Sequence, residues 1–291
     1  MRKYATVLAV YRNQYKLFYR NKIFFCQIAG RFFSKEKRSP VVVGDVVEID
    51  ENNLIVSVKA RKNLLGRKSK HNIYHQQVLF ANIDLLAIVS SVKQPSFKFQ
   101  FIDRMLVLAR YFNIEPMIVI NKIDLANSRF TLPDLYKDLG INVFYICANT
   151  GQGIDEFKKG ILKKKTAIVG QSGVGKTSII NRIIPELNLK TSEVHKQTGK
   201  GKHTTTVAEM FHIKGGGFIV DSQGIKSIGL MYIDNNELAK YFIEFRKFLP
   251  YCQFANCSHI HEPNCAIKKA VEQGKIAKSR YRSYVMIYYN K

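Results

Sequence analysis

A glycine-rich stretch in the second half of the chain has the residues of a phosphate-binding loop. The stretch GQSGVGKT (170–177) follows the apolar run TAIV (166–169) and opens a helical pattern, which is the context that this motif requires. Its glycines let backbone N–H groups converge on a phosphate. Lys176 can reach the β- and γ-phosphates, and Thr177 can ligate Mg²⁺. The stretch therefore predicts a nucleoside triphosphate site, for ATP or for GTP. Its predicted contacts are Gly170, Gln171, Ser172, Gly173, Val174, Gly175, Lys176, Thr177 and Ser178.

A second motif, NKID (121–124), has residue types that can read guanine. It follows the apolar run MIVI (117–120). The Asp124 carboxylate can accept from guanine N1–H and the exocyclic amine at once, and adenine offers no such pair. We expect Asn121 to bond the other polar edge of the base and the Lys122 stem to lie over the ring. Taken alone, NKID could also be an ordinary turn and helix cap.

Two further motifs are predicted at the same edge of the fold. CANTG (147–151) follows the run NVFYI, and DSQG (221–224) continues the run FIVD. Because ligands bind outside the carboxyl ends of parallel strands, all four loops would meet at one site whatever their order along the chain. The backbone N–H of Ala148 would donate to guanine O6. The predicted contacts in these loops are Cys147, Ala148, Asn149, Asp221 and Gly224.

Residues 1–68 are predicted to form a small β-barrel ahead of this sheet. Five short runs rich in Val, Ile, Tyr and Phe are separated by turn residues, as in an OB-fold. Basic and aromatic residues alternate between Arg12 and Lys22, which favours a surface that faces RNA. The alternative is that the aromatic side chains fill the barrel and the charges face solvent. The polar stretch RKNLLGRKSKHN (61–72) is predicted to be a linker.

From about residue 82 the pattern alternates between strands and helices. This alternation predicts a mostly parallel sheet covered by helices on both faces, and the section from about residue 235 is predicted to be helical. We therefore expect a multidomain α/β chain divided into residues 1–68, 69–232 and 233–291.

Four residues near the C-terminus have the spacing of a metal site, C-x4-C-x-H-x5-C. Three thiolates and an imidazole form a closed tetrahedral set, typical of one structural Zn²⁺ ion. A neighbouring histidine, His261, could replace the histidine of this set. The alternative is buried small cysteines beside a surface histidine. The predicted ligands are Cys252, Cys257, His259 and Cys265.

The charge of the chain points to a polyanionic partner. Its net charge of +24 favours nucleic acid, since each neutralised phosphate releases counterions. A basic surface that faces only solvent is the alternative. No apolar run reaches the roughly 18 residues that span a bilayer, so no membrane partner is expected. The odd cysteine count of five favours a reducing cytoplasm.

The order of these motifs resembles a known family. A guanine loop followed by a P-loop and then by GKHTTT (201–206) and DSQG, with a barrel before and a Cys/His cluster after, resembles the circularly permuted GTPases that act on the small ribosomal subunit. The resemblance implies an N-terminal OB-fold, a central circularly permuted P-loop GTPase domain and a C-terminal helical zinc-binding domain. It also implies binding to the 30S subunit and its 16S rRNA late in maturation, with stimulated GTP hydrolysis. A monomer is expected.

The resemblance also assigns residues around the γ-phosphate. Thr177, Asp221 and Thr205 are expected at Mg²⁺, and the Gly224 backbone N–H at the γ-phosphate. His203 is the candidate that positions water; the alternative is a histidine exposed in a basic loop.

Three positions depart from the family pattern. Lys202 replaces an arginine, DSQG replaces Asp-Thr-Pro-Gly, and Cys147 replaces a commoner serine. In addition, Ile225 follows Gly224 where many small GTPases carry a water-orienting glutamine. An RNA-binding module that senses GTP with little turnover is therefore the alternative function. An ATPase or kinase is disfavoured by Asp124.

Overall fold

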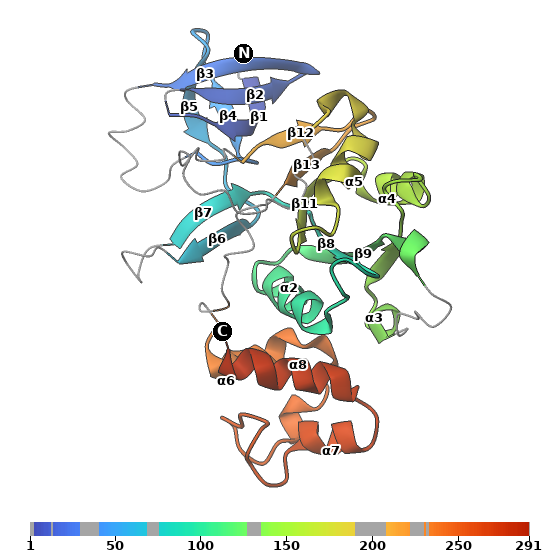
Figure 1. Cartoon of the computed structure of the whole chain (residues 1–291). Helices are drawn as coiled ribbons and strands as arrows, with labels where there is room; N and C mark the ends of the chain where they lie inside the picture. The colour runs from blue at the N-terminus through green and yellow to red at the C-terminus, as the bar shows by residue number, and fades with distance from the viewer. Residues whose placement is uncertain are drawn as a thin grey trace, which may run out of the picture.

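A computed structural model describes residues 3–12, 14–29, 41–68, 76–126, 135–189, 208–221, 230 and 233–290. The barrel lies at one end of the molecule, a six-stranded sheet lies in the middle and the C-terminal helices lie at the other end (Figure 1). No helix within the described ranges is long and apolar enough to cross a membrane.

The N-terminal barrel has the five strands that the sequence predicts. They close in the order β1-β2-β3-β5-β4. Alternate side chains such as Val7, Leu17, Val47 and Ile55 are fully buried inside it, as expected for strands with one face toward a core. The strands are β1 (Lys3–Val10), β2 (Tyr15–Tyr19), β3 (Lys22–Ile28), β4 (Val46–Ile49) and β5 (Leu54–Val58).

The predicted linker over 61–72 is wrong for its central part. Residues Leu64–Lys68 form strand β6, which pairs antiparallel with β7 (Gln76–Ala81). Leu65 lies opposite Phe80 in this pair, and each is 1% exposed. Burial of this apolar pair outweighs the basic flanks that suggested a linker. Residues 69–72 of the same prediction lie outside the described ranges.

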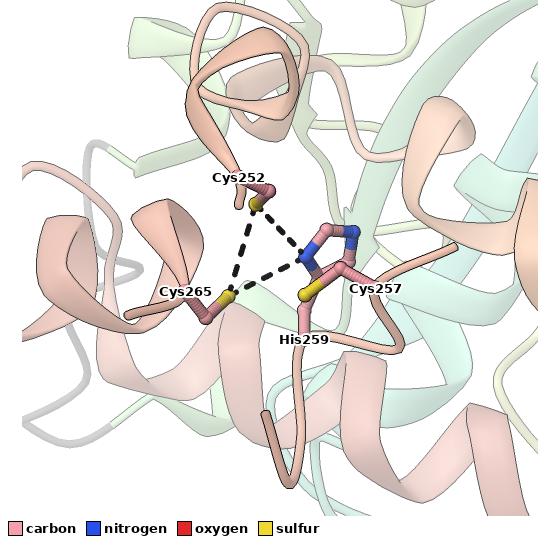
Figure 2. A group of neighbouring side chains, drawn as sticks. All are labelled: Cys252, Cys257, His259 and Cys265. Carbon is pink, nitrogen blue, oxygen red and sulfur yellow. Dashed lines mark hydrogen bonds between the residues drawn. The ribbon is translucent and has the colours of Figure 1, made fainter. Parts of the chain in front are cut away.

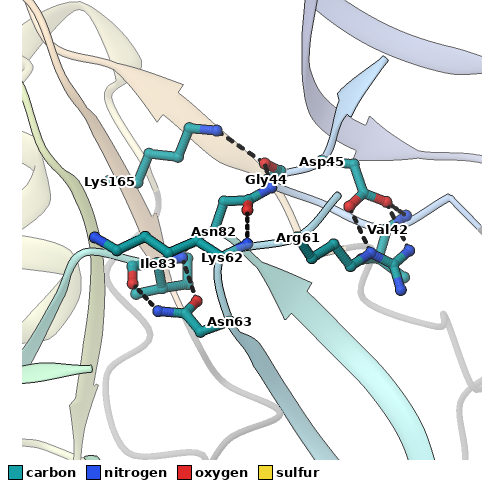
Figure 3. A network of polar contacts seen from close by, with 9 residues as sticks. All are labelled: Val42, Gly44, Asp45, Arg61, Lys62, Asn63, Asn82, Ile83 and Lys165. Carbon is teal, nitrogen blue, oxygen red and sulfur yellow. Dashed lines mark hydrogen bonds and ion pairs between the residues drawn. The ribbon is translucent and has the colours of Figure 1, made fainter. Parts of the chain in front are cut away.

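A polar network fixes the barrel to the central sheet (Figure 3). The fully buried Asp45 carboxylate accepts two hydrogen bonds of 2.8 Å from the Arg61 guanidinium. The carbonyl of Gly44 accepts from Lys165 at 2.8 Å and from Asn82 at 3.1 Å. A Cβ at position 44 would lie 2.1 Å from the Ala81 carbonyl oxygen, and φ there is +92°, so this close approach requires glycine.

The central sheet has the order β10-β9-β8-β11-β13-β12. All neighbouring strands are parallel except β12, which runs antiparallel to β13. Strand β8 is buried along its whole length at the centre. The strands are β8 (Leu85–Ser91), β9 (Glu115–Asn121), β10 (Asn142–Tyr145), β11 (Lys165–Gly170), β12 (Met210–His212) and β13 (Phe218–Asp221).

Helices cover both faces of this sheet, as predicted. Leu86 and Ile88 of β8 pack with residues of α2 and α3, and Leu85, Ala87 and Val89 pack with α4 and α5. These helices are α2 (Phe99–Tyr111), α3 (Leu135–Asp138), α4 (Ile154–Ile161) and α5 (Lys176–Ile183), with short 3-10 turns at Ile123–Leu125 and Pro185–Leu187.

The C-terminal section is helical, and its helix α8 packs against α2. Arg280 of α8 is buried between the carboxylates of Asp103 on α2 and Glu244, and its Nε donates to Glu244 at 2.6 Å. These carboxylates raise the pKa of Arg280 although burial opposes its charge. The elements of the section are α6 (Asn235–Leu238), α7 (Ala266–Glu272) and α8 (Lys278–Tyr289), with 3-10 turns at Ala239–Tyr241, Ile243–Phe245 and Leu249–Tyr251.

Candidate functional site: the nucleotide edge and the zinc cluster

The glycine-rich loop lies at the carboxyl end of β11, between the strand and α5. The Lys176 ammonium group donates to the carbonyls of Gly170 and Gln171 at 2.9 Å each, so it lies across the mouth of the loop. Gly175 begins α5 with φ of +94°, and a Cβ there would lie 2.3 Å from the Asn121 amide nitrogen. Only glycine therefore lets the guanine motif approach this close to the phosphate loop.

Asn121 joins three loops through one buried side chain. Its amide nitrogen donates to the Val174 carbonyl at 2.8 Å, and its amide oxygen accepts from the Ala148 N–H at 3.0 Å. The side chain is 1% exposed. We expected this amide to meet the base and the Ala148 N–H to meet guanine O6. In the structure Asn121 contacts Val174 and Ala148, so it holds the phosphate loop and the CANTG loop at a fixed separation.

Asp124 is exposed at the same edge and is oriented by Cys147. The buried Cys147 thiol lies 3.0 Å from one Asp124 carboxylate oxygen and donates to it. A thiol is a weak hydrogen-bond donor, but it lies where a serine hydroxyl would donate to the same carboxylate. The departure of Cys147 from the family pattern therefore keeps a donor next to the carboxylate predicted to read guanine.

Two contributors to this edge were missed by the sequence analysis. The loop after β8 also leaves the sheet here, between the neighbours β9 and β11, and its Gln94 carbonyl accepts from the Lys122 ammonium. Arg182 on α5 donates from Nε to the Ala148 carbonyl at 2.8 Å and from its other end to Asn149. The strand-end rule could have found the β8 loop. Arg182 belongs to no recognisable motif, so the sequence could not predict its contacts with the CANTG loop.

The nucleotide edge is thus the carboxyl ends of β8, β9, β10, β11 and β13. Asp221 ends β13, and its Cα pairs in register with Ile168 of the phosphate-loop strand. The remaining predicted residues on the γ-phosphate side lie outside the described ranges. They are Lys202, His203, Thr205, Gly224 and Ile225.

The four predicted metal ligands come together in the C-terminal section (Figure 2). The ligand atoms of the zinc cluster, Cys252, Cys257, His259 and Cys265, all lie within 4.8 Å of one another. The His259 Nδ1 atom lies 3.5 Å from the Cys252 sulfur and 3.4 Å from the Cys265 sulfur. His261 instead meets the Tyr289 hydroxyl at 2.7 Å, so it is not part of the cluster. Three sulfurs and one imidazole nitrogen at these separations fit a tetrahedral zinc ion.

Burial and hydrogen bonds shift the pKa values of groups in and beside this cluster. Burial raises the pKa of the Cys257 thiol to about 12, and a bound cation reverses this by holding the thiolate. Burial alone would raise the pKa of Glu262 as well, but hydrogen bonds from the Ser258 N–H and hydroxyl hold it at about 2. The Tyr281 hydroxyl on α8 donates to the His259 carbonyl at 2.7 Å, which ties the cluster to that helix.

The fold and the nucleotide edge define a P-loop GTPase domain whose guanine motif precedes its phosphate loop, which is a circular permutation. Residues 58–231 match the family model described as RsgA GTPase, and the chain belongs to this family. Its members are GTPases, which makes this chain a GTP hydrolase.

Curated relatives and solved structures agree with this family. The chain is 37% identical over 276 residues to "Small ribosomal subunit biogenesis GTPase RsgA" of Flavobacterium psychrophilum, covering 90% of this chain and 85% of the relative. It is 39% identical over 271 residues to RsgA 2 of Bacteroides thetaiotaomicron, covering 89% and 87%. The crystal structure of YjeQ from Thermotoga maritima superposes with a TM-score of 0.78 at 32% identity, over 99% of this chain and 98% of that one. YloQ, titled a circularly permuted GTPase, gives 0.77 at 28% identity, over 99% and 94%.

Proposed function

We propose that this protein binds the 30S ribosomal subunit through 16S rRNA and hydrolyses GTP to GDP and phosphate late in maturation of that subunit. Contact with the subunit stimulates turnover. The observation that carries the proposal is the buried Asn121 side chain. Its amide nitrogen donates to the Val174 carbonyl at 2.8 Å and so connects the loop proposed to read guanine to the phosphate loop. The names of the relatives, small ribosomal subunit biogenesis GTPases, support the partner.

The contacts at the nucleotide edge support GTP binding. Asp124 accepts from guanine N1–H and its amine, oriented by the Cys147 thiol. Lys176 exchanges its contacts with Gly170 and Gln171 for the β- and γ-phosphates, because its ammonium group is already at the mouth of the loop. The remaining contacts proposed for the nucleotide are those predicted from the sequence.

The γ-phosphate side is assigned by the family resemblance. Mg²⁺, held by the hydroxyl and carboxylate oxygens of Thr177, Asp221 and Thr205, would neutralise charge on the phosphates, and these oxygens suit that hard cation. His203 positions the attacking water, and the Gly224 N–H binds the γ-phosphate. A structural Zn²⁺ ion stabilises the C-terminal section.

The proposal includes the organisation of the chain and its place in the cell. Residues 1–68 contain the RNA-binding barrel, residues 69–232 form the GTPase domain and residues 233–291 the zinc-binding domain. The protein works in the cytoplasm as a monomer. The high positive charge of +24 supports an RNA partner.

One alternative is favoured by a specific residue. Ile225 follows Gly224 and cannot orient water by a hydrogen bond, which fits an RNA-binding module that senses GTP with little turnover.

A turnover measurement tests the proposal and separates it from this alternative. GTP hydrolysis is measured with and without purified 30S subunits, with 50S subunits and ATP as controls. We expect stimulation by 30S alone and for GTP alone. Tight GTP binding without stimulation would favour the sensor.

A further inference from the structure

One arginine connects the helix of the phosphate loop to the CANTG loop. Arg182 lies in the last turn of α5, and helical side chains lean toward the N-terminus of their helix, so it reaches back toward the nucleotide edge. Its Nε donates to the Ala148 carbonyl at 2.8 Å, and its Nη2 donates to the Asn149 carbonyl. One planar guanidinium therefore holds two consecutive peptide units of the CANTG loop.

These contacts are not those of an arginine that only stabilises its own helix. A cation in the last turn favours the helix dipole, and it often donates to the last carbonyls of that helix. In α5 the Ile183 carbonyl accepts from Lys158 at 3.2 Å, whereas Arg182 donates to a residue 34 positions earlier in the chain. Arg182 is also exposed, so its contribution lies in these hydrogen bonds rather than in core packing.

The backbone of the CANTG loop is closed into a tight turn by Cys147. The Cys147 N–H donates to the Gln152 carbonyl at 2.9 Å, and the Gly151 N–H donates to the Cys147 carbonyl at 2.8 Å. Arg182 acts between these points, on the two peptide units that follow Ala148 and Asn149. It therefore sets the orientation of the peptide units at the tip of the loop.

The orientation of these peptide units decides where their N–H groups point. In a planar trans peptide the C=O and the N–H point in opposite directions. Because Arg182 holds the Ala148 carbonyl, the Asn149 N–H of the same peptide unit points away from the arginine. The Ala148 N–H donates to Asn121 of the guanine motif, so the backbone donors of this loop lie beside that motif. Guanine O6 has two lone pairs and can accept from two N–H groups there.

We propose that Arg182 is a positioning residue for guanine recognition, which orients the CANTG loop so that the Asn149 N–H donates to O6 beside the Ala148 N–H. The inference rests on the proposed binding of guanine at this edge, and it adds a second donor to O6 and a residue that acts without touching the nucleotide. The cationic donor also polarises the peptide units that it holds, which makes their N–H groups stronger donors. Adenine presents an amine at the position of O6, so two N–H groups there discriminate against it.

Binding of three nucleotides to the intact chain and to Arg182→Lys tests this role. Lysine keeps the positive charge at the end of α5 but lacks the planar pair of donors. ITP lacks the exocyclic amine of GTP and keeps O6, whereas 6-thio-GTP carries sulfur, a weak acceptor, in place of O6. In the variant we expect the Kd for GTP and for ITP to rise about tenfold, and the Kd for 6-thio-GTP to rise about twofold at most.

A matched control and two further readouts accompany this titration. Lys158→Ala removes a basic side chain that donates to a carbonyl of α5 and not to the CANTG loop, so it should bind all three nucleotides as the wild type does. In Arg182→Lys the KM for GTP should rise with kcat unchanged, because a contact to the base is equally strong in the ground and transition states. The thermal midpoint should stay the same, since Arg182 is exposed.

The outcomes that overturn the inference differ from those that overturn the proposed function. Equal losses of affinity for all three nucleotides in Arg182→Lys would show a general effect on the nucleotide edge and would overturn the inference, as would unchanged GTP affinity. A wild type that binds GTP and 6-thio-GTP equally would contradict the O6 contact on which the inference rests. None of these measurements uses 30S subunits, so failure of 30S stimulation would contradict the proposed function without changing the result at Arg182.

Discussion

The zinc cluster and the nucleotide edge are assembled in opposite ways. The zinc cluster takes all its ligands from residues 252–265, and its second layer of hydrogen bonds comes mainly from the same stretch. The nucleotide edge takes loops from five strands between β8 and β13, and one side chain, Asn121, connects three of them. When one ligand is removed from a site built by a single short stretch, only the structure around that site should be disrupted. A site built from distant loops should lose affinity when any connection is removed.

Removal of a zinc ligand should give the largest effect, and a local one. Metal binding supplies about 10 kcal/mol or more of folding free energy in small zinc domains. We expect Cys265→Ser to lose bound zinc and to abolish hydrogen-exchange protection in α7 and α8, with GTP binding retained. Metal analysis and exchange mass spectrometry measure both. Cys26→Ala, a thiol of the barrel core, should keep its zinc. A simultaneous loss of GTP binding in Cys265→Ser would break the contrast between the two regions.

Removal of the buried ion pair that joins α8 of the C-terminal section to α2 should give the next largest effect. Arg280→Ala leaves Asp103 buried without its cationic partner, and breaking a buried ion pair costs about 3–5 kcal/mol. Denaturant unfolding should show this loss, whereas Arg282→Ala, an exposed arginine on the same helix, should stay within about 0.5 kcal/mol of wild type. Adding Asp103→Asn to Arg280→Ala should recover part of the loss. No recovery would mean that packing, and not charge, holds the joint.

Loss of the Asn121 amide should weaken nucleotide binding through the connected loops. Each buried partner left unsatisfied costs about 1–3 kcal/mol, so Asn121→Ala should raise the Kd for GTP about a hundredfold. Titration with a fluorescent GTP analogue measures this change. Asn142→Ala, an exposed asparagine at the opposite end of β10, should bind normally. Wild-type affinity in Asn121→Ala would mean that the loops hold their positions without it.

The smallest expected effect is at Cys147. Cys147→Ala removes a donor to Asp124 and should raise the Kd for GTP about fivefold, since a typical hydrogen bond contributes about 0.5–1.5 kcal/mol. Cys147→Ser keeps a donor and should restore affinity to wild type or better. Equal affinities in all three proteins would remove the thiol from guanine recognition.

Prediction from the sequence succeeded where a short pattern and its flanks agree. The five barrel strands, the parallel sheet and the zinc spacing were each specified by neighbouring residues. It failed where distant burial decides the outcome. Leu65 makes a strand of the predicted linker because Phe80 covers it. The contacts of Asn121 with Val174 and Ala148 were not predicted either, and they form because Gly175 lets the loops approach.

The sequence by itself determined which chemistry this protein carries: a phosphate loop, a guanine-reading motif and a thiolate–imidazole set, because each depends on residue types at fixed short spacings. Tertiary structure alone decided how those motifs are connected. The choice of His259 over His261 and the link from Arg182 to the CANTG loop both depend on side chains that meet across large separations in the chain. Such contacts are set by the packing of whole elements, and no local pattern encodes them.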